Sequence, residues 1–189
     1  MTRSFGTLPG GETAHLYTIC GGGLTAGISD FGATLVSLLA PDREGHLADV
    51  VLGFDTAGEY LHGSGCLGAT VGRNANRVCG SCLPVGDRRV CLTPNEGPNN
   101  LHSGPEYWFH RMWMVDRLTE SAITLALETP EGDQGFPGMG RVEVTYALAE
   151  GRLRITYQGV FDRDTVFNMT NPSYFNLAGE ERPEAAMEQ

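Results

Sequence analysis

One stretch decides the fold, and it reads Arg141-Val142-Glu143-Val144-Thr145-Tyr146-Ala147-Leu148. Positions 142, 144, 146 and 148 are apolar and would share one face of a strand, because successive side chains point to opposite sides. The other face would carry Arg141, Glu143 and Thr145. Such alternation predicts a half-buried antiparallel strand. A turn at 149–151 and a second alternating run at 153–157 make the pair a predicted hairpin.

Working outward from this hairpin, the chain is rich in short strand-like runs and poor in helical periodicity. A single short helix is expected at 56–61, with Thr56 as its N-cap. Many short strands separated by Gly, Pro and Asn favour an all-β antiparallel β-sandwich. We expect one domain over residues 1–189, with a loose polar tail at 180–189. The further predicted strands are 24–29, 34–39, 49–54, 113–117 and 123–127.

Composition restricts the possible partners. Lys plus Arg number 13 and Asp plus Glu number 23, which gives a net charge of 13 − 23 = −10. This balance opposes binding to nucleic-acid phosphates and to anionic lipid, and it leaves a neutral ligand such as a sugar unaffected. We therefore expect no nucleic-acid partner and no membrane partner. The sequence also predicts no metal and no cofactor.

The cysteines predict a reducing environment. There are five, an odd number, and they show no framework spacing. The start of the chain lacks an apolar signal core, so a cytoplasmic location is the simplest interpretation. The pair Cys79 and Cys82 forms a lone C-x-x-C without a second pair, so it predicts neither a zinc site nor a redox site.

Four groups of segments carry a family resemblance. The opening strands, 32–38 and 49–55, are the least specific. The others read Gly-Arg-Asn-Ala-Asn-Arg-Val over 72–78, Asn-Glu-Gly-Pro-Asn-Asn-Leu-His-Ser-Gly over 95–104, and the turn at 131–138 with Thr-Asn-Pro-Ser-Tyr-Phe-Asn-Leu over 170–177. Together they resemble the N-terminal part of the aldose 1-epimerase (galactose mutarotase) family. The resemblance implies the galactose mutarotase-like β-supersandwich, incomplete here on its C-terminal side.

The resemblance assigns three residues to substrate binding. Asn76 and Arg77 match the Asn-Arg pair that faces the sugar, and His102 matches a histidine beside the ring oxygen. Their chemistry suits the role, because a guanidinium offers several fixed donors and an amide offers a donor and an acceptor. The alternative is a solvated surface loop. Ser103 replaces a family glycine, and a loop with positive φ there would tolerate serine less well.

Pro172 occupies the position of the family's general acid, a histidine. Proline has no side-chain proton to give. The family's second catalytic group, a glutamate, comes from a later region than Gln189, so we expect it to be missing from this chain. The fold is expected to survive these changes while catalysis falls to little or none. His102 is then the possible surrogate acid, and no catalytic residue is certain.

The resemblance implies an isomerase that interconverts the α and β anomers of hexoses such as galactose or glucose. In that reaction an acid protonates the ring oxygen while a base removes the anomeric hydroxyl proton. Two alternatives stay open. One is a non-catalytic carbohydrate-binding module on the same scaffold. The other is a fragment without a function of its own, which would expose sheet edges and self-associate.

Overall fold

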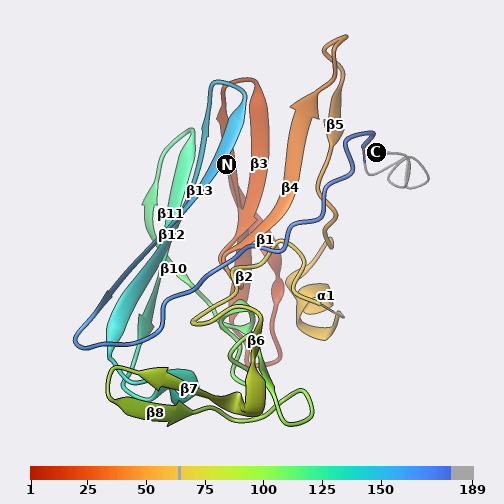
Figure 1. Ribbon diagram of the computed structural model, residues 1–189. Coiled ribbons are helices and arrows are strands. Elements are labelled where there is room, and N and C mark those ends of the chain that lie inside the picture. Colours follow the sequence, from red (N-terminus) through yellow and green to blue (C-terminus); the bar gives the residue numbers. More distant parts are fainter. Residues whose placement is uncertain (64, 180–189) are drawn as a thin grey trace.

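The computed structural model describes residues 1–63 and 65–179, so the tail predicted at 180–189 lies outside the described residues. Two antiparallel sheets stand side by side (Figure 1). The first contains β1 (Thr2–Thr7), β2 (Thr13–Gly21), β3 (Leu24–Ser29), β4 (Thr34–Pro41) and β5 (Leu47–Asp49), in that order. The second contains β10 (Met114–Leu118), β11 (Ala122–Thr129), β12 (Gly140–Ala149) and β13 (Arg152–Phe161), in that order.

The apolar faces of the two sheets enclose the main core, which confirms the all-β sandwich prediction. Val142, Val144 and Tyr146 of β12 are completely buried and belong to one cluster with Ile19 of β2 and Leu35 of β4. Burying side chains of this size contributes roughly 1.5–3 kcal/mol each. The alternation at 141–148 therefore encodes the contact between the sheets.

The predicted hairpin is present, with β12 and β13 paired from Gly140↔Phe161 to Ala149↔Arg152. Glu150 and Gly151 form the two-residue turn, and both have positive φ (51° and 69°). Positive φ at both positions is the geometry that matches the twist of paired strands. The strands predicted at 24–29, 34–39 and 123–127 are likewise confirmed, and the one predicted at 113–117 begins one residue later.

The strand predicted at 49–54 is wrong. Only Asp49 belongs to a strand, the short β5, and Val51 forms an isolated bridge to Phe175. The Asp49 carboxylate explains the interruption, because it accepts hydrogen bonds from the backbone N–H of Leu38 (2.9 Å) and of Val51 (3.0 Å). A side chain that replaces a ladder partner in this way ends regular pairing.

The helix prediction is confirmed as α1 (Ala57–His62). The Thr56 side chain accepts from the Glu59 backbone N–H, and the Glu59 carboxylate accepts in turn from the Asp55 backbone N–H and the Thr56 hydroxyl. This reciprocal arrangement is a capping box. No helix in the described part of the chain is long and apolar enough to cross a membrane.

Smaller elements lie below the sheets in Figure 1. They are the pair β6 (Arg77–Val78) and β9 (Asn100–Leu101), the hairpin of β7 (Cys82–Val85) and β8 (Arg88–Cys91), and three 3₁₀ turns at Cys79–Ser81, Trp108–His110 and Asp133–Gly135.

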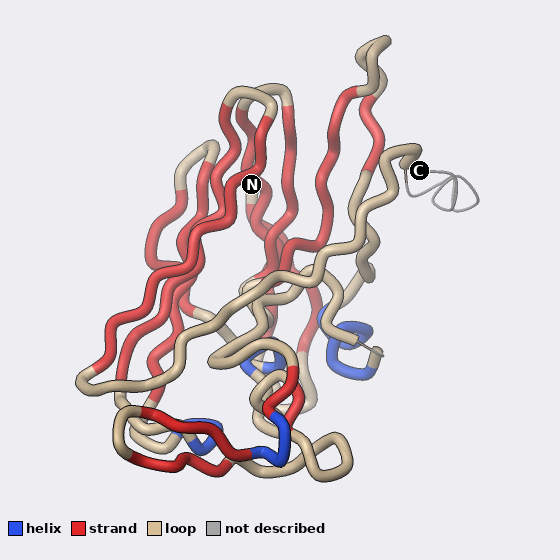
Figure 2. Tube along the Cα trace, in the orientation of Figure 1, coloured by secondary structure: helices blue, strands red, loops and turns tan. Residues whose placement is uncertain are grey.

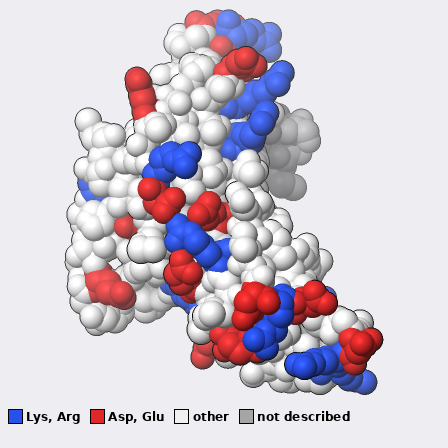
Figure 3. Space-filling view, turned by 90° about the vertical axis from the view of Figure 1, so that its left-hand side faces the viewer, with Lys and Arg blue, Asp and Glu red and all other residues white. Residues whose placement is uncertain are grey.

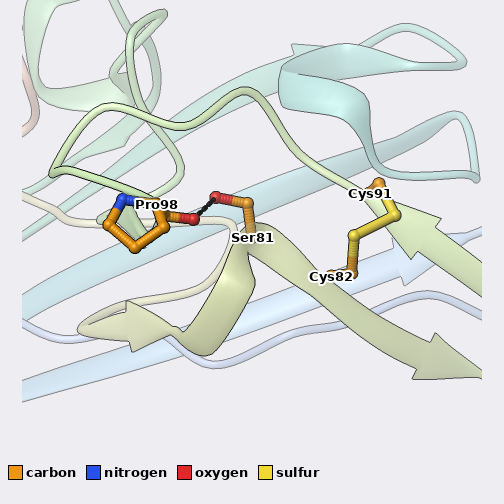
Figure 4. Close-up of a disulfide and its surroundings, with 4 residues drawn as sticks. All are labelled: Ser81, Cys82, Cys91 and Pro98. Carbon is orange, nitrogen blue, oxygen red and sulfur yellow. Dashed lines mark hydrogen bonds between the residues drawn. A yellow bond between two sulfur atoms is a disulfide. The ribbon is translucent and has the colours of Figure 1, made fainter.

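A disulfide joins Cys82 to Cys91 across the β7–β8 hairpin (Figure 4). This corrects the expectation that the cysteines form no disulfide framework. The two residues face each other in the ladder, which the spacing along the chain does not reveal. Beside the bond, the Ser81 hydroxyl donates to the Pro98 carbonyl oxygen at 2.9 Å. The hairpin is thereby tied to the loop that precedes β9.

The outer face of the second sheet is covered by mixed charge. Arg141 is central, because its guanidinium donates to Asp116 (2.7 Å), Glu128 (2.7 Å) and Glu143 (2.9 Å) on three strands of the sheet. Figure 3 faces this side of the molecule and shows acidic and basic side chains interspersed over it. Exposed ion pairs of this kind add little stability singly, although a shared arginine links several strands.

The last described segment, 162–179, crosses both sheets as a long irregular connection (Figure 2). It makes isolated bridges between Asn168 and Asn74, Thr170 and Val71, and Phe175 and Val51. The segment therefore brings the region around Pro172 next to the loop that begins at Gly68, whose backbone N–H donates to the Pro172 carbonyl oxygen at 3.1 Å.

Replacing Cys82 and Cys91 together by serine is expected to lower the free energy of unfolding by about 2–3 kcal/mol, because the cross-link restricts the unfolded chain. Urea unfolding without reductant measures the change. Cys20→Ser, which removes an exposed free thiol, is the control and should leave the midpoint where it is. Equal unfolding free energies for the double variant and the unmodified chain would contradict the disulfide.

Candidate substrate site

Pairing of two very short strands assembles the candidate site. In the β6–β9 pair, Arg77 faces Leu101 and Val78 faces Asn100. This pairing brings the loop at 72–77 against the loop at 94–104. Asn76, Arg77 and His102, which the resemblance assigns to substrate binding, therefore meet at one point of the surface.

The backbone of Asn76 fixes the protonation state of His102. The Asn76 N–H donates to His102 Nδ1 at 3.0 Å, and the His102 N–H donates to the Asn76 carbonyl oxygen at 3.0 Å. Since a backbone N–H only donates, Nδ1 is the unprotonated nitrogen and the neutral ring carries its proton on Nε2. Burial and the nearby Arg77 cation lower the pKa of His102, against a smaller opposing effect of Glu96. His102 is thus a neutral hydrogen-bond donor at pH 7.

Arg77 is held by a bidentate ion pair with Glu96, through Nε at 2.6 Å and Nη2 at 2.7 Å. Its remaining nitrogen, Nη1, donates weakly to the Asn76 side-chain oxygen at 3.4 Å. Hydrogen bonding from Arg77 lowers the pKa of Glu96, and the same bond raises the pKa of Arg77. Glu96 is consequently a poor general base, while Nη1 is the part of Arg77 that a ligand can use.

Two asparagine side chains support the His102 loop from inside. Asn95 accepts from the Leu101 N–H at 2.6 Å and donates to the Leu101 carbonyl oxygen at 2.8 Å. Asn100, which is fully buried, donates to the carbonyl oxygens of Thr93 (2.7 Å) and Gly104 (2.9 Å). Buried backbone groups need such partners. The His102 loop is therefore held in one conformation by internal hydrogen bonds.

Arg73, the other arginine of the 72–78 motif, is completely buried. Its Nη1 donates to the carbonyl oxygens of Pro137 (2.8 Å) and Gly138 (3.0 Å), and its guanidinium lies 4.7 Å from the centre of the Phe161 ring. Burial lowers the pKa of Arg73. This residue links the turn at 131–138 to the site loop, while its Nε and Nη2 are buried without a hydrogen-bond partner.

Asn168 contacts the loop that carries Asn76, and the sequence analysis did not single it out. Its side chain donates to the Asn74 side-chain oxygen (3.0 Å) and to the Ala75 carbonyl oxygen (3.3 Å). Its carbonyl oxygen also accepts from the Ala75 N–H at 2.7 Å. The residues in contact are more than 90 positions apart along the chain, and no local signal in the sequence indicates such a pair.

Pro172 lies four residues after Asn168 on the same segment. Its neighbour Asn171 donates to the Gly68 carbonyl oxygen (2.6 Å) and to the Tyr146 hydroxyl (3.2 Å). Since proline lacks an N–H, the only backbone group that Pro172 offers is its carbonyl oxygen, which Gly68 binds. Pro172 thus fits the backbone here.

The candidate residues lie on an open surface. Asn76 and Arg77 are exposed and His102 is partly buried. Two hollows of the described surface lie elsewhere. One, of about 450 Å³, is lined by residues 85–88, 137 and 162–164, and a smaller one of about 110 Å³ is lined by residues of β1, β2, β4 and the 49–55 region. Neither contains Asn76, Arg77 or His102.

Comparison with known proteins identifies relatives over nearly the whole chain. Galactose mutarotase of Sus scrofa is 38% identical over 185 residues, which are 97% of this chain and 54% of that protein. Aldose 1-epimerase of Escherichia coli K12 is 37% identical over 175 residues, which are 92% of this chain and 51% of that protein. The chain therefore spans about half the length of the curated relatives it matches.

Solved structures agree with the sequence relatives. A GalM/aldose epimerase homologue from C. elegans superimposes with a TM-score of 0.81 at 37% identity, over 88% of this chain and 52% of that one. Galactose 1-epimerase from Lactobacillus acidophilus gives a TM-score of 0.80 at 25% identity, over 94% of this chain and 53% of that one. The family model described as aldose 1-epimerase matches residues 15–188. This chain belongs to the aldose 1-epimerase family.

Proposed function

We propose that this chain binds hexoses such as galactose or glucose through Asn76, Arg77 and His102, and that it interconverts their anomers little or not at all. The observation that carries the proposal is the contact between Asn76 and His102, which occupies Nδ1 and leaves Nε2–H as the donor that the neutral imidazole can offer. Arg77 Nη1 and the Asn76 amide supply further donors and an acceptor beside it. Such a set matches the hydroxyls and ring oxygen of a sugar.

The same groups explain why turnover should be weak. Anomer interconversion needs an acid for the ring oxygen and a base for the anomeric hydroxyl, and each positioned group contributes typically about 10²–10⁴-fold. Pro172 has no proton to give. Glu96, the carboxylate of this site, is committed to Arg77. Neutral His102 donates a hydrogen bond to the ring oxygen and thereby polarises it without transferring a proton.

The surrogate-acid role of His102 stays a prediction, and the geometry of the ring weighs against it. An imidazolium carries a proton on Nδ1 as well as on Nε2. The Nδ1 proton would then point at the Asn76 N–H, so two donors would face each other. Charging the ring therefore breaks the contact that positions it.

A non-catalytic carbohydrate-binding module is the alternative that these same contacts favour. It shares the hexose and the three binding residues with the first proposal, and the two differ only in turnover. A residual rate above the buffer background distinguishes a slow enzyme from a module.

Self-association is a further proposal, and exposed strand edges support it. Within the described residues, β13 pairs with β12 on one side only. Its Val160 is 66% exposed, and Tyr174 and Phe175 of the crossing segment are 60% and 52% exposed. Unpaired strand edges beside apolar side chains invite pairing with another chain.

The cytoplasmic location also stays a proposal. The Cys82–Cys91 disulfide weighs against a strongly reducing compartment, because disulfides persist mainly in oxidising ones. Alkylation of free thiols in intact cells, followed by mass spectrometry of the 79–91 region, measures which state prevails.

Polarimetry of freshly dissolved α-galactose and α-glucose is expected to show no acceleration by the unmodified chain. Pro172→His, which restores a titratable group at the acid position, should raise the rate above that baseline by up to about 10²-fold. Acceleration by the unmodified chain would overturn the proposal of weak turnover. His102→Ala in that active chain would then decide whether His102 is the acid.

Galactose affinity is expected to be constant above pH 7 and to fall only at pH values lower than about 6.5, the ordinary histidine pKa, because the ring charges at the lowered pKa of His102. The sign follows from the lowered pKa of His102: the native site favours the neutral ring, so acidification charges Nδ1 and opens its contact with Asn76. Titration calorimetry at several pH values measures it. His102→Gln should weaken binding at every pH and abolish the acid dependence, while His46→Gln, at an exposed turn, should change neither.

Light scattering is expected to give a mass above the 20.3 kDa of one chain, and Val160→Lys should shift the protein toward the monomer. A lysine on an edge strand blocks edge pairing because its charge would have to be buried. Thr119→Lys adds the same charge in an exposed turn and serves as the control. A stable monomer from the unmodified chain would contradict the proposal.

A further inference from the structure

Ser103 has a backbone conformation that serine rarely adopts. Its φ is +60°, and His102 directly before it has φ +56°. Two successive residues other than glycine in the left-handed region are disfavoured, because Cβ crowds the backbone there. The family pattern has glycine at position 103, and glycine adopts this φ freely. The serine side chain therefore needs a compensating contact.

The Ser103 hydroxyl makes two hydrogen bonds, both to one residue of the opposite loop. Its Oγ accepts from the Asn74 N–H at 2.9 Å and donates to the Asn74 carbonyl oxygen at 3.0 Å. Ser103 is completely buried, so water does not compete for these groups. The Ser103 N–H donates in addition to the Asn100 side-chain oxygen at 3.1 Å. The hydroxyl and the N–H of Ser103 thus bind Asn74 in one site loop and Asn100 in the other.

The hydroxyl lies next to the contact that defines the site. Asn74 is two residues before Asn76, and Ser103 is one residue after His102. The loops are already joined by the Asn76 N–H to His102 Nδ1 bond and by the His102 N–H to Asn76 carbonyl bond. The β6–β9 pairing joins the same loops on the other side of this contact. The Ser103 bonds to Asn74 add a connection beyond it, so the Asn76–His102 contact is held from both sides.

We propose that Ser103 is a positioning residue, whose hydroxyl holds the His102 imidazole against Asn76 and so keeps the proton on Nε2. The role of this tautomer in sugar recognition rests on the proposed function above. The positioning itself concerns the imidazole and can be measured without a sugar. A glycine at 103 would keep the backbone conformation and lose the two hydrogen bonds to Asn74.

Nitrogen-15 NMR of the His102 ring in the full chain tests the proposal. In the unmodified chain the spectrum should show the Nε2–H tautomer with a lowered pKa. In Ser103→Gly and Ser103→Ala we expect a mixture of tautomers and a pKa that rises toward about 6.5. Galactose affinity should fall by about threefold to tenfold, the scale of a net hydrogen bond or less.

Thr119→Ala is the matched control, because the Thr119 hydroxyl likewise accepts from the N–H and donates to the carbonyl oxygen of one residue, Ala122, in a distant turn. It should leave the His102 spectrum unchanged. Ser103→Gly removes the backbone strain together with the hydroxyl, so it keeps the test valid where Ser103→Ala fails to fold. An unchanged tautomer and pKa in Ser103→Gly would overturn the proposal. Failure of the unmodified chain to bind galactose would overturn the proposed function. The NMR spectrum of the His102 ring would then still decide the role of Ser103.

Discussion

The arrangement of the two sheets and of the segment 162–179 depends on the hydrogen bonds of one buried hydroxyl, that of Tyr146. Tyr146 is fully buried on the inner face of β12, where burial raises its pKa to about 12 and keeps it protonated. Its hydroxyl donates to the Ala33 carbonyl oxygen at 2.7 Å and accepts from the Asn171 side chain at 3.2 Å. An unpaired hydroxyl at this depth would cost about 1–3 kcal/mol. The same atom therefore connects the second sheet to the first sheet and to the segment that carries Pro172.

The segment 162–179 links Tyr146 to the candidate site by hydrogen bonds. Asn171 is bound at Tyr146 and Gly68, and Asn168, three residues earlier, binds Asn74 and Ala75 beside the Asn76–His102 contact. The site loop thus lies between Asn168 on one side and the His102 loop on the other. Its geometry is set by backbone and amide hydrogen bonds, which hold position better than a charged pair on the surface does. The exposed Arg77–Glu96 pair alone would be a weak anchor.

Sequence predicted the parts of this arrangement that depend on local pattern. The β12–β13 hairpin follows from alternation, and α1 follows from Thr56 as its N-cap. Prediction from sequence failed where a side chain binds a residue that is not close to it along the chain. Asp49 ends the strand predicted at 49–54 by binding the backbone of Leu38, and Cys82 pairs with Cys91 because a hairpin places them opposite each other. Asn168 could not be assigned, since its partners lie more than 90 residues away. The family resemblance named Asn76, Arg77 and His102, and the fold brings these three together, while their roles stay predictions.

Two departures from the family pattern, Pro172 and Ser103, affect the site in opposite ways. Proline stands where the resemblance implies a proton donor, and its carbonyl oxygen accepts from the Gly68 N–H. Serine accepts an unfavourable φ and adds two hydrogen bonds that fix the loops. Rate acceleration requires interactions that are stronger in the transition state than in the ground state. In the proposed function, a rigid neutral donor at His102 would bind a ring oxygen in both states nearly alike, whereas a proton transferred from position 172 would act only as the ring opens. On the proposed function, these two residues weight the chemistry of the chain toward holding a sugar and away from opening it.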